Sequence, residues 1–223
     1  MLPIVFLVAL AFLASTFITY VLWPNWPAPA VAPDAPPLPI TVAGTAFNVP
    51  PAAMRVPVQR RAGAHERVDL AVLWPSLEPP DPNANSVVAQ PNAPPTAAKA
   101  LERIFVMIAA AGDTLPPDER IKTIYPRYAT TEPVAGPDGL AVLAFREGTP
   151  YQGEDLIYDA SAPDNFLVRC TRDGAGPTPG TCLYSLRIEA ADIVVRFPRD
   201  WLKDWRFVAS NVERLIKSLR PAS

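Results

Sequence analysis

The chain has 223 residues, of which 49% are hydrophobic, and its formal net charge is −2. This length suits one folded domain with linkers. Because the charge is balanced, the chain lacks the excess of positive charge that is typical of nucleic-acid-binding proteins. No phosphate-binding loop, dinucleotide fingerprint or metal-ligand spacing occurs, so we expect no cofactor and no metal.

The first predicted element is a transmembrane helix over residues 1–23. Ile4 to Trp23 contains no charged residue, and about 20 apolar residues at roughly 1.5 Å each match the hydrocarbon thickness of a bilayer. A cleaved signal peptide is the alternative. Signal peptides begin with a basic region, however, and the first basic residue of this chain is Arg55. We therefore predict an uncleaved anchor that contacts the lipid bilayer through residues 4–23.

A proline-rich linker is predicted over residues 24–43. Proline accounts for 29 residues of the chain and is dense from Pro24 to Pro39. This composition favours an extended polyproline II spacer of roughly 3.1 Å per residue. Such a spacer would hold a domain away from the membrane. A recognition segment for a proline-binding partner is the alternative.

Residues 44–223 are predicted to form one α+β domain with a mostly antiparallel β-sheet. Strands are expected where alternating, β-branched or aromatic residues are bounded by turn residues. The predicted strands are 45–49, 67–74, 103–108, 140–146, 155–158, 166–169, 183–188 and 193–197. A helix through residues 96–110 is the alternative to the strand at 103–108. Residues 75–95 are expected to be a mobile proline-rich loop, and a short helix is expected from Pro116 to Pro126.

The only two cysteines, Cys170 and Cys182, flank a loop rich in glycine and proline. Two cysteines at the neck of such a hairpin can close a disulfide, which indicates an oxidising compartment. Two buried unpaired thiols are the alternative. We predict the disulfide, and with it a C-terminal domain in the periplasm and a single pass through the inner (cytoplasmic) membrane.

The clearest helix is predicted at the C-terminus, with Asp200 as its N-cap. Apolar residues recur there at spacings of three and four, as on one face of an amphipathic helix. They are Trp205, Val208, Val212, Leu215, Ile216 and Leu219. We predict that this helix covers one face of the sheet, because an uncovered sheet needs a second layer. Docking on a partner or on the membrane is the alternative.

Catalytic candidates are few. His65 is the only histidine, and no nucleophile elbow accompanies it. Four carboxylates near one predicted hairpin, those of Glu147, Glu154, Asp155 and Asp159, could in principle form a glycosidase-type pair. Hairpin charges are usually solvated, so we predict no catalytic residue and no enzyme. An envelope hydrolase built on these groups is the least favoured hypothesis.

Two short segments are candidates for a binding surface. They place basic residues beside aromatic or amide groups, which suit anionic glycans or the carboxylates of a partner. The candidate residues are Arg60, Arg61, Tyr125, Arg127 and Tyr128. A turn and a helix end with ordinary surface arginines are the alternative.

Three stretches resemble an uncharacterised family of membrane-anchored proteobacterial proteins of unknown function. They run from Phe47 to Pro75, from Glu119 to Tyr128 and from Gly139 to Tyr151. The resemblance implies an exported, anchored domain and supplies no catalytic residues. The leading hypothesis is a membrane-anchored periplasmic accessory protein with a protein partner in the cell envelope. A domain that binds a small ligand or a glycan is the alternative.

Overall fold

A computed structural model of the protein describes residues 2–22, 31–32, 34–80, 103–174 and 179–221. The chain divides into two compact units, Met1–Ala30 and Val31–Ser223. The first unit contains α1, a helix of 21 residues from Leu2 to Leu22 without a charged side chain. Within the described residues, no helix combines the length and the apolar character needed to cross a membrane.

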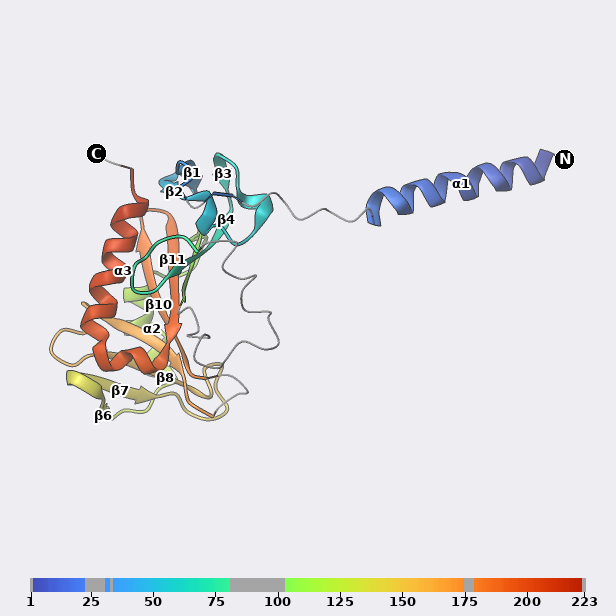
Figure 1. Cartoon of the computed structure of the whole chain (residues 1–223). Helices are drawn as coiled ribbons and strands as arrows, with labels where there is room; N and C mark the ends of the chain where they lie inside the picture. Colours follow the sequence, from blue (N-terminus) through green and yellow to red (C-terminus); the bar gives the residue numbers. More distant parts are fainter. Residues whose placement is uncertain (1, 23–30, 33, 81–102, 175–178, 222–223) are drawn as a thin grey trace, which may run out of the picture. The chain divides into compact units, whose positions relative to one another are not determined.

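The second unit is built on an eight-stranded sheet with the order β4-β5-β11-β10-β9-β8-β7-β6 (Figure 1). Each neighbouring pair is antiparallel. Strands β6 to β11 form a continuous meander, and β5 and β4 extend the sheet beyond β11. The strands are β4 (Arg67–Leu73), β5 (Arg103–Ala110), β6 (Val134–Ala135), β7 (Leu140–Ala144), β8 (Glu154–Asp159), β9 (Leu167–Thr171), β10 (Thr181–Ile188) and β11 (Ala191–Pro198).

A smaller sheet has the order β2-β1-β3 and consists of β1 (Leu38–Val42), β2 (Thr45–Val49) and β3 (Gly63–His65). Ala43 and Gly44 join the first two strands, with φ angles of 49° and 82°. Two positive φ angles are typical of the tight hairpin turn whose twist suits antiparallel strands. Strand β1 thus lies inside the range 24–43 that we expected to be linker. Its alternating apolar residues, with Ile40 and Val42 buried, are set among prolines that hide the strand pattern.

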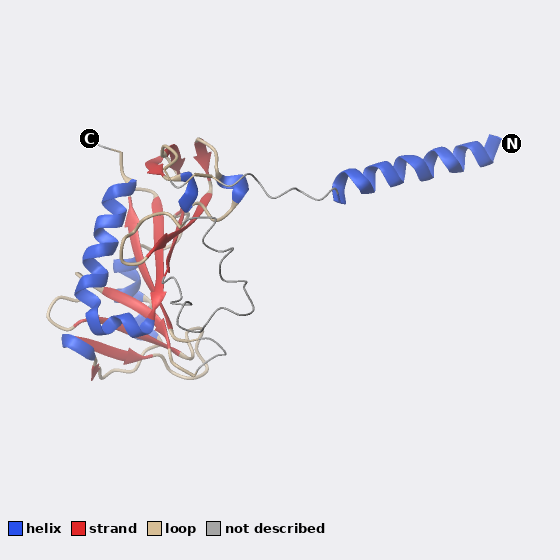
Figure 2. Ribbon diagram, in the orientation of Figure 1, coloured by secondary structure: helices blue, strands red, loops and turns tan. Residues whose placement is uncertain are grey.

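Helix α3 (Trp205–Leu219) covers one face of the large sheet, as predicted (Figure 2). Its buried apolar side chains are Trp205, Val208, Val212, Leu215, Ile216 and Leu219. The ring of Trp205 lies 4.8 Å from that of Phe166. The predicted N-cap was wrong. Asp200 lies in η6 (Arg199–Asp204), a 3₁₀ segment that separates β11 from the α-helix.

Helix α2 (Pro117–Thr123) and the 3₁₀ turn η4 (Tyr125–Arg127) pack on the opposite face of the sheet. A second, smaller apolar cluster forms under α2 and η4. Its buried members are Tyr125, Ala129, Phe145 and Leu156. The predicted short helix is therefore present, although α2 ends before Pro126 and the proline lies in η4.

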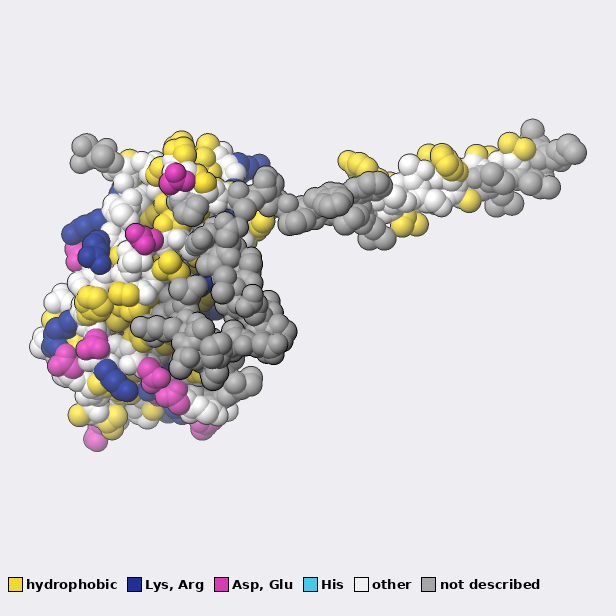
Figure 3. All heavy atoms as spheres, in the orientation of Figure 1, with side chains coloured by type: hydrophobic (Ala, Val, Ile, Leu, Met, Phe, Trp, Pro, Cys, Tyr) yellow, Lys and Arg dark blue, Asp and Glu magenta, His cyan; other side chains and the backbone are white. Residues whose placement is uncertain are grey.

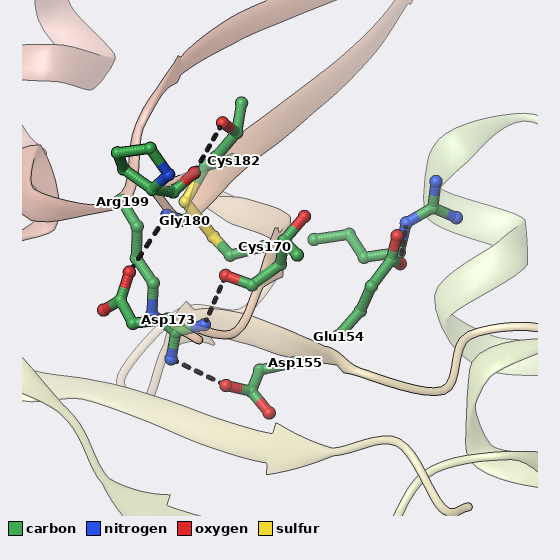
Figure 4. The surroundings of a disulfide bond; sticks show 11 residues. Glu154, Asp155, Cys170, Asp173, Gly180, Cys182 and Arg199 are labelled. Atoms are coloured by element: carbon green, nitrogen blue, oxygen red, sulfur yellow. Dashed lines mark hydrogen bonds and ion pairs between the residues drawn. A yellow bond between two sulfur atoms is a disulfide. The ribbon is translucent and has the colours of Figure 1, made fainter. Parts of the chain in front are cut away.

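The predicted disulfide is present. Cys170 on β9 and Cys182 on β10 are direct cross-strand partners, with their Cα atoms 4.0 Å apart, and their sulfur atoms are bonded. Both cysteines are buried in the core beneath α3. Figure 4 shows the carboxylate of Asp155 and the guanidinium of Arg199 beside this bond.

Other sequence predictions have clear outcomes. Strands β7 and β8 form the predicted hairpin. Residues 103–110 form β5, so the strand was the right choice over the helix from residue 103 onward. Residues 96–102 and most of the expected loop 75–95 lie outside the described residues.

Candidate binding face

The face of the large sheet opposite α3 is the candidate binding face. Successive side chains of a strand point to opposite faces, so the register assigns each residue to one of them. One row on this face crosses seven strands from β4 to β7. It consists of Ala71, Phe105, Arg196, Leu183, Arg169, Leu156 and Leu143. Helix α2 and η4 pack over the β8–β10 part of this face, and the hollows that open on it include two with volumes of about 280 and 460 Å³.

The first hollow, here called the arginine hollow, has a volume of about 280 Å³. Its lining includes Arg55, Arg67, Asp69, Phe105, Leu183 and Arg196. The guanidinium carbon of Arg55 lies 4.8 Å from the centre of the Phe105 ring. Arg196 on β11 is the direct cross-strand partner of Phe105 on β5. Two cationic side chains therefore flank one aromatic ring.

Asp69 is the acidic residue of this lining, and it is already paired. Arg67 donates two hydrogen bonds to its carboxylate, at 2.9 and 2.6 Å, and Gln59 donates a third at 3.3 Å. The hydrogen bonds from Arg67 lower the pKa of Asp69 below its ordinary value. The side chains of Arg55 and Arg196 make no ion pair or hydrogen bond with other described residues. The arginine hollow thus has an excess of positive charge.

The second hollow, here called the apolar pocket, has a volume of about 460 Å³. Its lining includes Ile121, Pro126, Leu143, Leu156, Pro163 and Leu167. Thr130, Thr131 and Tyr158 add hydroxyl groups to this lining. The volume falls within the range of roughly 300–1,000 Å³ that is typical of small-molecule sites.

Polar contacts at the β10–β11 end of the sheet hold α2 against it. Arg187 on β10 donates to Asp192 on β11 at 2.7 Å and to the carbonyl oxygen of Thr114 at 3.0 Å. Arg120 of α2 lies 3.7 Å from the same Asp192 carboxylate. This network joins two guanidinium groups to one carboxylate, and it ties α2 to the end of the sheet where β10 turns into β11.

Arg169 on β9 lies in the row that crosses the binding face, as the cross-strand partner of Leu183. Its Nε is 2.6 Å from the carboxylate of Glu154, and its guanidinium carbon is 5.0 Å from the centre of the Tyr151 ring. Burial raises the pKa of Tyr151. Arg169 is thus already paired with a carboxylate, in contrast to Arg55 and Arg196.

The five residues predicted as a binding surface fall into two separate groups. Tyr125 and Tyr128 both contact the ring of Tyr151, at centroid distances of 5.4 and 5.6 Å. Arg127 is exposed beside Pro126 of the apolar pocket. Arg60 donates to the carbonyl oxygen of Met54, and Arg61 precedes β3. Strands β3 and β7 lie at opposite ends of this unit in Figure 1, so the two groups do not form one site.

The catalytic candidates have structural partners. The Nε2 atom of His65 lies 2.8 Å from the carbonyl oxygen of Arg61. Glu154 and Asp155 point away from each other in Figure 4, and each is paired with arginine. Among the described residues, no group of three or more His, Cys, Asp or Glu side chains could hold a metal ion.

The expectation that hairpin carboxylates are solvated was wrong for two of the four. Asp155 is 5% exposed and Asp159 is 8% exposed. Asp159 accepts hydrogen bonds from the backbone N–H and the hydroxyl of Ser161, at 2.9 and 2.7 Å. The hydrogen bond from the Ser161 hydroxyl lowers the pKa of Asp159.

Sequence reasoning missed Arg55, Phe105 and Arg196. The signal for Arg196 was present, because it is out of phase with the buried Ile193, Val195 and Phe197 and must point to the other face. On the side of the second unit drawn in Figure 3, acidic and basic side chains are interspersed. That side shows no comparable excess of one charge.

No family model matches the chain, and no curated protein sequence matches it. The fold is similar to that of Smlt3025, an immunity protein of the Stenotrophomonas maltophilia type IV secretion system. That match has a TM-score of 0.52 and 18% identity, and it covers 84% of this chain and 94% of the other. The Neisseria meningitidis iron-regulated outer membrane lipoprotein FrpD matches with a TM-score of 0.48 and 11% identity, over 84% of this chain and 93% of the other. At 18% identity, the likeness to Smlt3025 concerns the fold alone.

Proposed function

We propose that this chain is a non-catalytic interaction protein of the bacterial cell envelope. Its binding face would recognise a protein partner. The observation that carries the proposal is the pair of hollows on one sheet face, one apolar and one rich in arginine. Protein interfaces combine an apolar centre with polar surroundings, and arginine and aromatic residues are enriched in them.

Two further observations support this proposal. The structural neighbour Smlt3025 is an immunity protein of a secretion system, which favours a role in recognition over catalysis. The disulfide between Cys170 and Cys182 favours an oxidising compartment. We place the second unit in the periplasm, tethered to the inner membrane through residues 4–23. The tether rests on the apolar sequence of that segment and on its resemblance to membrane-anchored proteobacterial proteins.

Site-specific photocrosslinking in intact cells tests the proposal. A photoreactive amino acid would replace Thr131, which is exposed at the apolar pocket. The control position is Ser210, which is exposed on α3, on the other side of the sheet. We expect a discrete protein adduct from position 131 and none from position 210. Identical adduct patterns at both positions, or no adduct at position 131, would contradict a partner on the binding face.

The volume and lining of the apolar pocket favour a second candidate function, the binding of a small apolar ligand. Leu143 is half-buried in the pocket wall, and Leu143→Trp would fill part of the space. We expect a hydrophobic fluorophore such as 1-N-phenylnaphthylamine to bind the wild-type chain and to bind the variant at least about fivefold more weakly. Equal binding to both proteins would exclude the pocket as the site. Arg61 and Arg127 lie too far apart to form one glycan site, so the structure does not support that alternative.

A further inference from the structure

The charges of the arginine hollow indicate the chemistry of the partner. We infer that this hollow binds carboxylate side chains of an acidic segment of the partner protein, with Arg55 and Arg196 as the two ligating groups. This inference rests on the proposed function and deepens it. The hollow differs from the surface predicted from the sequence, because none of Arg60, Arg61, Tyr125, Arg127 and Tyr128 lines it.

The geometry of the hollow holds the guanidinium of Arg55 over an aromatic ring and places Arg196 beside the same ring. Phe105 lies on the binding face with Arg55 over its ring at 4.8 Å and Arg196 directly opposite it across β5 and β11. Stacking on an aromatic ring uses the face of a guanidinium and leaves its N–H groups free. Each guanidinium carries five N–H donors in a planar fork that fits a carboxylate. The two forks therefore offer unused donors to a shared space.

The surroundings favour an anion over a cation. The carboxylate of Asp69 is hydrogen-bonded by Arg67 and also attracts Arg55. One negative charge therefore faces three arginines in the lining, and the net charge of the hollow is positive. A lysine or arginine from a partner would meet unpaired positive charge. Leu183, Met107 and Val194 complete the lining with apolar atoms, which suit the methylene groups of a glutamate side chain.

The small extent of the positive surface favours a protein ligand over a nucleic acid. The chain has a net charge of −2, and basic side chains are mixed with acidic ones on the side shown in Figure 3. Nucleic-acid binding needs an extended basic surface that follows the phosphate backbone. The hollow instead has Arg55 over the ring of Phe105 and Arg196 opposite that ring across the strand pair, neither of them ion-paired with another described residue. This arrangement matches a local cluster of carboxylates, with Arg and an aromatic residue as interface anchors.

Binding of a fluorescein-labelled peptide of ten glutamates tests the inference. The full chain in a non-ionic detergent would be titrated at low salt, as wild type and as the single variants Arg55→Glu and Arg196→Glu. Both residues are exposed, so their substitution should leave the fold intact, as an unchanged unfolding midpoint would verify. Lys203→Glu in η6 is the matched control, because it makes the same charge change at an exposed residue outside the hollow.

We expect each hollow variant to bind the peptide at least about tenfold more weakly than wild type, and the control to stay within about twofold. Equal weakening in all three variants, or unchanged binding in the hollow variants, would overturn the inference. So would equally tight binding of a deca-lysine peptide. If inorganic phosphate at an equal concentration displaced the peptide, the hollow would be a site for small anions. That result would contradict the inference that it binds a partner protein. Crosslinks from position 131 would survive such a failure, so the proposed function can be judged separately.

Discussion

At the scale of single residues, the buried carboxylate of Asp155 connects several strands. It accepts hydrogen bonds from Arg172 Nε at 2.7 Å and from Arg199 Nη2 at 2.6 Å. Arg172 also donates to the carbonyl oxygen of Phe145, and Arg199 donates to that of Thr171. The carboxylate thus positions two arginines that bridge neighbouring segments beside the disulfide (Figure 4). A structural role of this kind explains why an acidic residue of a hairpin is buried.

We expect Asp155→Asn to destabilise the second unit by about 3 kcal/mol, because it removes a buried charge that two half-buried arginines share. Urea denaturation followed by tryptophan fluorescence would measure the change. Glu147→Gln is the matched control, since this carboxylate is exposed and lies 3.8 Å from the same Arg172. The control should shift stability by less than about 0.5 kcal/mol. Equal effects of the two substitutions would show that burial of Asp155 is not the cause.

The second prediction concerns Asp69, whose pKa is lowered by hydrogen bonds from Arg67. An unfolded Asp has a pKa of about 3.9. Because the folded value is lower, the unfolded state binds more protons in this range. The stabilisation is therefore present above about pH 4 and is lost as the pH falls through the folded pKa. Arg67 is exposed, so the contribution should be below about 1 kcal/mol.

Carbon-13 NMR of the Asp69 carboxyl group would measure its pKa directly, and we expect a value below 3.9. In denaturation experiments, Asp69→Asn should lose less stability than wild type between about pH 5 and pH 2. An ordinary pKa for Asp69, together with the same acid dependence in both proteins, would contradict the prediction.

At the scale of elements, the β9–β10 hairpin depends on its covalent link. Residues 170 and 182 close a short loop, and a loop of this size is stabilised by roughly 3 kcal/mol in the chain-entropy model. We expect the double variant Cys170→Ala, Cys182→Ala to lose about that much stability in urea denaturation. Dithiothreitol should destabilise the wild type and leave the double variant unchanged. A reductant effect of equal size on both proteins would show that the hairpin does not need the disulfide.

Local patterns predicted the elements that depend on neighbouring residues. Each of three patterns lies within one segment of the sequence. They are the alternating residues of β4, the two cysteines that flank the β9–β10 turn, and the apolar face of α3. Strand β1 was missed because prolines surround its alternating residues. The start of α3 was placed too early. Asp200 lies in the first turn of the 3₁₀ segment η6, where an acidic residue is as favourable as it is in the first turn of an α-helix.

The candidate site could not be predicted because distant segments form it. Phe105 and Arg196 become neighbours only through the pairing of β5 with β11, and Arg55 reaches the ring from the segment before β3. Nothing near Arg55 or Arg196 in the sequence marks them as a pair. Arg60 and Arg61 were favoured because they stand beside the amide of Gln59 in the sequence, although Arg60 already donates to the carbonyl oxygen of Met54.

At the scale of the whole molecule, the proposed tether and the candidate binding face belong to different compact units. The second unit contains the described strands, the disulfide and both hollows. The proposed tether lies in the first unit, and the residues that line the two hollows belong to the second. The tether should therefore determine where the chain is found in the cell without affecting what the second unit binds.

We accordingly expect residues 31–223, exported behind a cleavable signal, to fold without residues 1–30. Their urea midpoint should match that of the second unit in the full chain, and Cys170 and Cys182 should be protected from thiol reagents until reduction. The full chain should stay in the membrane pellet after an alkaline wash, because only detergent releases a helix inserted in the bilayer. The truncated chain should appear in the periplasmic fraction. Release of the full chain by alkali alone would disprove the tether, whereas an unfolded truncated chain would disprove the independence of the second unit.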